Sequence, residues 1–141
     1  MNQQIFSYEC VTLRLSTGVG LAERVPAASG LNWGQRPGRN HDQAYLAVPA
    51  DVQRSDFFPE PGYEFSMITD DSEAWKCARR QANGKAIHTI KDNAILGWYF
   101  RERLGLAPGD LVTLAHLLRY GRTSVDIYKE DITCYHLDFR T

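Results

Sequence analysis

The sequence predicts a mainly β protein, a barrel or pseudobarrel of seven or so short strands with two short helices. Apolar and polar residues alternate over many short stretches, and glycine- or proline-containing turns separate these stretches. Apolar residues at helical spacing are few. With 141 residues, the chain has the size of a single domain spanning 1–141, and it is long enough to bury a sizeable core.

The strands follow from this alternation and from the turns between them. Asp70–Asp71–Ser72 predicts the turn of a hairpin, and Asn83–Gly84 predicts a second tight turn. Trp75, Cys77 and Arg79 then share one face of the strand between the two turns. The expected strands cover 8–15, 44–48, 64–69, 73–80, 86–90, 111–114, 125–128 and 135–139.

Helices are expected in fewer places. One short helix follows Pro49, and a longer one over 93–104 has Asp92 as its N-cap and Gly105 as its stop signal. Its apolar stripe, which includes Tyr99 and Phe100, is typical of a core-facing helix. His116–Tyr120 predicts one helical turn closed by a glycine.

Charge is balanced overall but unevenly distributed along the chain. The net charge of −1 excludes the global basic signature of a non-specific nucleic-acid binder. From Asp42 to Glu73 there are eight acidic residues and one basic residue, whereas Lys76 to Arg103 holds seven basic and two acidic residues. Folding can therefore separate a basic face from an acidic one, although such runs are commonly just solvated surfaces.

The three cysteines are odd in number and widely spaced, which argues against a disulfide framework. We expect Cys10 and Cys77 to be reduced core residues and the protein to occupy a reducing cytoplasm. The first ten residues, MNQQIFSYEC, lack the pattern of a signal peptide, and no apolar stretch has the length of a membrane span.

The segment Gly30–Gln43 is a polar loop broken by glycines, and its forked side chains are of the kind that contact base edges. Pro37–Gly38 would present the two flanking arginines at the loop tip. Trp33 either stacks on a sugar or anchors the loop to the core, and both roles stay open. The candidate DNA contacts in this segment are Asn32, Trp33, Gln35, Arg36, Arg39, Asn40, His41 and Asp42.

A second polar segment, 79–93, surrounds the Asn83–Gly84 turn. Its basic residues are expected to neutralise phosphates, while its amides are candidates for base contacts. Strand alternation turns about half of these side chains away from a bound duplex. The candidate contacts are Arg79, Arg80, Gln81, Asn83, Lys85, Thr89, Lys91 and Asn93.

Searches for a catalytic site give nothing specific. No histidine belongs to an HExxH motif or to a His-x-Lys pair, and Asp70–Asp71 with Lys76 lacks the spacing of a metal nuclease. Cys134 and His136 share one strand face and would need a third ligand to bind zinc. Ordinary core or surface roles are favoured for them, so we predict no catalytic residue, metal or cofactor.

Three stretches of the chain resemble a known family. Gly84–Leu114, GKAIHTIKDNAILGWYFRERLGLAPGDLVTL, resembles the second half of a B3-like DNA-binding domain. SGLNWGQRPGRNHDQAYLAVP and LLRYGRTSVDIYKEDITCYHLDF resemble the C-terminal recognition domain of bacterial restriction endonucleases of the BfiI and NgoAVII type. The similarity covers nearly the whole chain, from about Leu13 to Phe139. LNWGQR and YGRT are its more specific segments.

The resemblance implies a seven-stranded open pseudobarrel whose two extensions grip the major groove of DNA. By position, the N-arm is 31–43 and the C-arm is about 79–93. In the full-length relatives a phospholipase-D-like nuclease half precedes this domain, and that half is missing here. The chain is then either an excised domain or a protein that depends on a partner for cleavage.

We therefore expect sequence-specific binding of double-stranded DNA, as the recognition module of a type II restriction endonuclease acting with a nuclease domain and no membrane. Two alternatives remain at this point. A small β-barrel enzyme or ligand-binding protein would have a concave pocket with convergent titratable groups. A protein-interaction module would expose Trp33 as a hot spot.

Overall fold

The computed structural model describes residues 9–141, and within them seven strands form a single sheet. The strand order is β1-β6-β7-β3-β4-β5-β2. All pairs are antiparallel except β3 with β7. The strands are β1 (Glu9–Arg14), β2 (Leu46–Ala47), β3 (Phe65–Thr69), β4 (Ala74–Arg80), β5 (Ala86–Thr89), β6 (Ser124–Asp131) and β7 (Cys134–Asp138).

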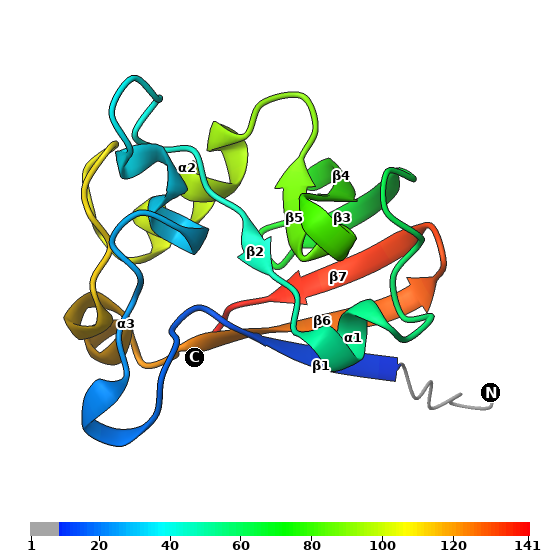
Figure 1. Ribbon diagram of the computed structural model, residues 1–141, viewed down its shortest axis with the longest axis horizontal. Helices are drawn as coiled ribbons and strands as arrows, with labels where there is room; N and C mark the ends of the chain where they lie inside the picture. The colour runs from blue at the N-terminus through cyan, green and yellow to red at the C-terminus, as the bar shows by residue number, and fades with distance from the viewer. Residues whose placement is uncertain (1–8) are drawn as a thin grey trace, which may run out of the picture.

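The sheet curls into a barrel that is not fully closed. Its edge strands, β1 and β2, approach each other without pairing, so an open seam runs between them. Figure 1 shows α2 and α3 together at the end of the barrel away from the β6–β7 turn. The helices are α1 (Ala50–Gln53), α2 (Ala94–Arg103) and α3 (Leu114–Tyr120), with 3-10 turns η1 (Gly20–Ala22), η2 (Gly30–Gln35) and η3 (Ala82–Gly84).

Alternate residues of the strands fill the barrel with one apolar core. Burial of this apolar surface is the main contribution to stability. The inward positions include Leu13, Phe65, Met67, Trp75, Cys77, Val125, Ile127, Tyr135 and Leu137. Leu96, Tyr99 and Phe100 of α2 close one end of the core, as their helical spacing predicts.

Asp70, in the β3–β4 turn, fastens α2 to the sheet. Its carboxylate accepts hydrogen bonds from the Tyr99 hydroxyl (2.6 Å) and the Phe139 backbone N–H (2.7 Å), and it pairs with Arg103. Burial alone would raise the pKa of Asp70, but these hydrogen bonds and the Arg103 charge outweigh it and lower that pKa. Asp70 is thus committed to the fold and not to a nuclease site.

The predicted strand at 111–114 is wrong. The backbone of Val112 is paired with the Asn32 side chain, whose Oδ1 accepts from Val112 N (2.8 Å) and whose Nδ2 donates to Val112 O (2.7 Å). This pairing replaces a neighbouring strand. The chain then enters α3 through a capping box between Thr113 and His116.

Most other sequence predictions hold. The structure confirms the hairpin strands β3 and β4, and it confirms α2 with its glycine stop. The predicted helical turn at 116–120 is part of α3, and β2 is shorter than expected. Cys77 is buried as predicted, whereas Cys10 is exposed because it faces outward beside Tyr128. The signal-peptide prediction concerns residues that lie mostly outside the described range. No helix within 9–141 combines the length and apolar character that a membrane crossing requires.

Candidate nucleic-acid interface

The N-arm, residues 31–43, is a loop that closes on itself. The Gly34 N–H donates to the Gln43 carbonyl at 2.8 Å, so the two ends of the loop are joined. A Cβ at Gly34 would overlap the Asn40 carbonyl oxygen, which explains the glycine. Gly38, with φ of +80°, forms the exposed tip.

A buried arginine on α2 fixes the base of the N-arm. The Arg101 guanidinium, 1% exposed, donates to the carbonyls of Leu31 (3.2 Å), Asp110 (2.7 Å) and Gly97 (3.3 Å). Its Nε lies 3.5 Å from the Asp42 carboxylate. Burial lowers the pKa of Arg101, while the negative charges of Asp42 and Asp110 oppose that shift.

Asp42 completes this connection from the other side. Its carboxylate accepts the Gly109 N–H at 2.7 Å, tying the arm to the turn after α2. A Cβ at Gly97 would overlap the Asp42 carbonyl, so only glycine lets the arm and the helix come this close. The N-arm is therefore attached to the barrel by charge, hydrogen bonds and close packing.

The outer part of the N-arm carries two accessible cations. Arg36 is exposed, and its Nε donates a hydrogen bond to the Ala28 carbonyl at 2.8 Å. The Arg39 guanidinium lies over the Trp33 ring, 3.8 Å from its centroid, and its Nε donates to Gln43 Oε1 at 2.9 Å. Trp33 thus supports Arg39 from below by a cation–π contact.

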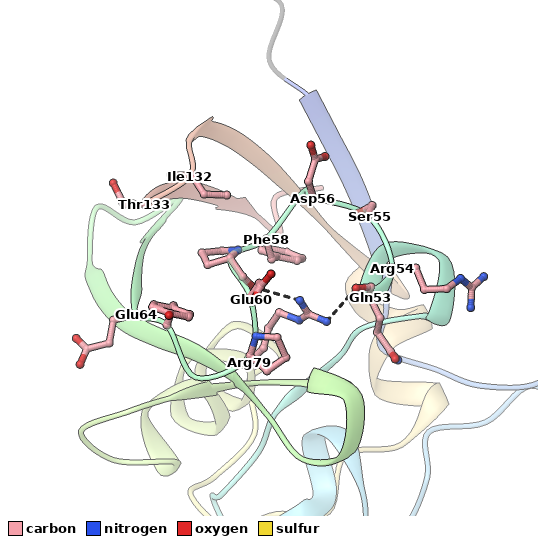
Figure 2. A pocket seen from close by; sticks show the side chains of 13 residues that line it. Gln53, Arg54, Ser55, Asp56, Phe58, Glu60, Glu64, Arg79, Ile132 and Thr133 are labelled. Atoms are coloured by element: carbon pink, nitrogen blue, oxygen red, sulfur yellow. Dashed lines mark hydrogen bonds between the residues drawn. The ribbon is translucent and has the colours of Figure 1, made fainter.

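The C-arm, residues 79–93, is shaped by an arginine that points inward. Figure 2 shows the Arg79 side chain reaching across a pocket toward Gln53, the last residue of α1. The guanidinium donates to the carbonyls of Pro59 (3.1 Å), Gln53 (3.2 Å), Gly84 (3.0 Å) and Asn83 (3.1 Å). Burial lowers the pKa of Arg79, which the nearby Glu60 charge opposes.

These bonds fold the C-arm tip into a tight turn that directs its polar side chains outward. Gln81 and Asn83 have positive φ values of 65° and 61°, and the Gln81 carbonyl accepts the Gly84 N–H at 3.0 Å. Gln81, Asn83 and Lys85 are all exposed, as is Arg80 at the end of β4. The tip therefore presents two cations and two amides to solvent.

The two arms meet at an aromatic junction formed by Trp33, Tyr45 and His88. The ring centroids of Trp33 and His88 are 5.0 Å apart, and those of Tyr45 and His88 are 5.8 Å apart. Gln81 Nε2 lies 3.1 Å from His88 Nε2. Side-chain contacts at the junction therefore link the N-arm, strand β5 and the C-arm tip.

His88 sits between the cations of both arms. Burial, then Arg80 and then Arg39, lower its pKa to about 4, so the ring is neutral at pH 7. The positive charges of both arginines therefore act on the same imidazole. Sequence reasoning did not select Tyr45 or His88 as site residues, although strand alternation places His88 on the same face as Ala78, its partner on β4.

The last part of the C-arm leads into α2. Thr89 Oγ1 donates to the Asp92 carbonyl at 2.7 Å, and Asp92 Oδ1 accepts the Ala94 N–H at 2.9 Å. The Asp92 carboxylate therefore satisfies an N–H at the start of α2, as expected of a capping residue, but the N-cap position itself is held by Asn93, whose side chain makes no capping hydrogen bond. Lys91 is exposed and Asn93 is half-buried.

Four of the predicted contact residues have structural roles instead. Asn32, Asp42, Arg79 and Thr89 are all less than 8% exposed, and each is hydrogen-bonded to backbone groups. Their polar groups are already satisfied within the protein, so little of their hydrogen-bonding capacity is left for a ligand. The other predicted contact residues are exposed or half-buried: Trp33, Gln35, Arg36, Arg39, Asn40, His41, Arg80, Gln81, Asn83, Lys85, Lys91 and Asn93.

A comparison with protein families identifies the type of domain. The sequence model of a family described as the NgoFVII C-terminal B3-like DNA-binding domain matches residues 3–131. The match contains the strands β1 to β6, both arms and the aromatic junction. A search of curated proteins finds no match to the chain.

Proposed function

This chain belongs to the family of NgoFVII C-terminal B3-like DNA-binding domains, and we infer that it binds double-stranded DNA sequence-specifically as the recognition domain of a restriction endonuclease. The observation that carries the inference is the aromatic junction. It brings the exposed polar groups of the N-arm and the C-arm onto one surface. Two arms on one surface can contact one groove.

The exposed side chains suit two different tasks. Arg36, Arg80, Lys85 and Lys91 carry positive charge at the surface and suit contacts to phosphates. Arginine also makes bidentate contacts to guanine, and the amides of Gln81 and Asn83 suit adenine. The carboxylates of the acidic stretch from Asp51 to Glu73 lie outside both arms, which lowers the repulsion of a phosphate backbone.

We propose that one copy binds a short asymmetric site in the major groove. The two arms differ in length, backbone shape and side chains, so they present different groups to the two halves of a site. A protein that binds an asymmetric site does not need a second copy related to it by two-fold symmetry. We further propose that a nuclease domain in the parent protein performs cleavage, in a reducing cytoplasm that suits three free cysteines.

The Arg79 pocket in Figure 2 does not favour a small-ligand function. Its most buried charged group, Arg79, already donates to four backbone carbonyls, so it has little capacity left to bind an anion. Neither arm's exposed contact residues line this pocket. The pocket is therefore better explained as part of the support of the C-arm.

Selection of bound duplexes from a random pool tests the proposed function. We expect one short motif to be enriched at moderate salt, and the affinity for that motif to fall steeply as salt rises. A variant with Arg36→Ala and Arg80→Ala should enrich no motif, whereas Arg119→Ala, an exposed change on α3, should enrich the same one. If the unmodified chain enriches no motif at any salt concentration, the function is refuted.

A further inference from the structure

Three side chains with metal-binding groups lie together on the outer face of the β6–β7 hairpin. They are Glu130 of β6 and Cys134 and His136 of β7, and their ligand atoms all lie within 4.8 Å of one another. Glu130 Oε1 and His136 Nε2 are 2.9 Å apart. None of the three belongs to either arm, so this cluster is separate from the proposed DNA interface.

The backbone brings these side chains together in a specific way. Cys134 and His136 are two residues apart on β7, so they point to the same face. Between Lys129 and Asp131 the β6–β7 register shifts, which leaves Glu130 as the extra residue of a bulge. A bulge redirects a side chain, and here it places Glu130 over the same face of β7.

The neighbouring carboxylate is occupied elsewhere. Asp131 Oδ1 accepts from the backbone N–H and the hydroxyl of Thr133, both at 2.8 Å, and so forms the hairpin turn. Glu130, in contrast, has its carboxylate directed to His136. Asp131 therefore stabilises the hairpin turn, and Glu130 is the acidic residue that faces the cluster.

We propose that Glu130, Cys134 and His136 bind a zinc ion. Thiolate, imidazole and carboxylate are the three protein ligand types of zinc, and a water would complete a tetrahedral site. The side chains of Glu130 and His136 are 47% and 38% exposed, so an ion can enter and a water can occupy the fourth position.

The charges around the cluster are compatible with this assignment. A thiolate and a carboxylate together balance the two positive charges of zinc. Lys76 lies on the same sheet face, with its Nζ donating to Ser66 Oγ at 3.2 Å, and Ser66 is the register partner of Cys134. A neutral zinc site therefore meets little repulsion from Lys76. The ion would hold the bulge of β6 against β7.

Cobalt(II) titration of the full chain tests the site, because cobalt replaces zinc and a cobalt–thiolate bond absorbs in the near ultraviolet. We expect one equivalent of cobalt to give this band, and zinc to remove it. Cys134→Ser should abolish the band, and His136→Gln should weaken binding at least tenfold. Cys10→Ser removes an exposed cysteine on strand β1, away from the cluster, and should change neither result.

A second test compares the Tm of each protein with and without zinc. This difference depends neither on DNA binding nor on how stable each variant is by itself. Zinc should raise the Tm of the unmodified chain and of Cys10→Ser but not that of Cys134→Ser. Absence of a thiolate band in the unmodified chain would overturn the proposal. An unchanged band in Cys134→Ser, or an equal rise in Tm in both cysteine variants, would do the same.

Discussion

The ring of Trp33 in the N-arm lies 5.0 Å, centroid to centroid, from the ring of His88 on strand β5. Arg39 covers Trp33, and Gln81 of the C-arm contacts His88. A chain of four side chains thus joins two segments that are about forty residues apart in the sequence. The relative position of the arms is therefore set before any DNA is bound.

His88 makes stability depend on pH. Its pKa is about 4 in the folded protein and 6.5 in the unfolded chain. As the pH falls, His88 therefore takes up a proton in the unfolded chain before it does so in the folded protein. The stability that the fold gains from a neutral His88 ring is complete above pH 6.5 and is lost as the pH falls toward 4. Between pH 7.5 and pH 5, we expect the free energy of unfolding to fall by up to about 2 kcal/mol from this group.

Urea unfolding at these two pH values measures the effect. His88→Phe keeps an aromatic ring in the junction but removes the titration, so its stability should fall less between the two pH values than that of the unmodified chain. His41→Ala, at an exposed position, should behave like the unmodified chain. Equal pH dependence in all three proteins would contradict this role of His88.

Gly97→Ala should destabilise the protein although alanine is the better helix former. In an open helix this change would stabilise by about 1 kcal/mol. At Gly97 the new methyl group would overlap the Asp42 carbonyl and push the N-arm away from α2, which we expect to cost about 1–3 kcal/mol net. Glu102→Ala, exposed on the same helix, should be nearly neutral in thermal unfolding. A more stable Gly97→Ala protein would show that the arm does not rest on this helix.

Arg101→Met should be among the most damaging changes in the chain. It removes a buried cation, so the Asp42 carboxylate loses its opposite charge and the Leu31 carbonyl loses the Arg101 donor. We expect a loss of about 3–5 kcal/mol in the free energy of unfolding. Arg119→Met, at an exposed position, is the matched control and should stay within about 0.5 kcal/mol. A loss for Arg101→Met no greater than that of the control would argue against the anchoring of the N-arm by α2.

Arg36→Ala and Arg39→Ala should each weaken binding of the selected duplex by about 1–3 kcal/mol if the arginine contacts a guanine. Fluorescence anisotropy measures the affinity for the selected duplex and for duplexes with single base-pair changes. If an arginine contacts a given base pair, changing that base pair should weaken the binding of the corresponding alanine variant less than it weakens the binding of the unmodified chain. Unchanged affinity for both variants would remove the N-arm arginines from the recognition surface.

The strands and α2 were predictable because their signals are local. Alternation marks β3 and β4, and Asp92 and Gly105 mark the ends of α2. The segment at Val112 was not predictable, because its backbone partner, Asn32, lies 80 residues away in the sequence. The alternation of apolar residues in the sequence is the same whether a neighbouring strand or a side chain makes the hydrogen bonds to the backbone of the segment.

The site was predictable as two segments but not residue by residue. Asp42 and Arg79 have the same chemistry as their exposed neighbours, and only distant carbonyls and N–H groups show that they are committed to the fold. His88 lies on strand β5, and Tyr45 directly precedes strand β2, so neither carried a polar-loop signal. Their role follows from the ring contacts that the fold creates beside Trp33.

The salt dependence of binding to the selected duplex tests most directly whether both arms contact one DNA. For each phosphate contact removed, the slope of log K against log salt concentration should decrease by about one. We predict that Arg36→Ala in the N-arm and the pair Arg80→Ala and Lys85→Ala in the C-arm each reduce the slope, and that their effects add. If removing the two C-arm cations changes neither affinity nor slope, only one arm binds DNA and the account is contradicted.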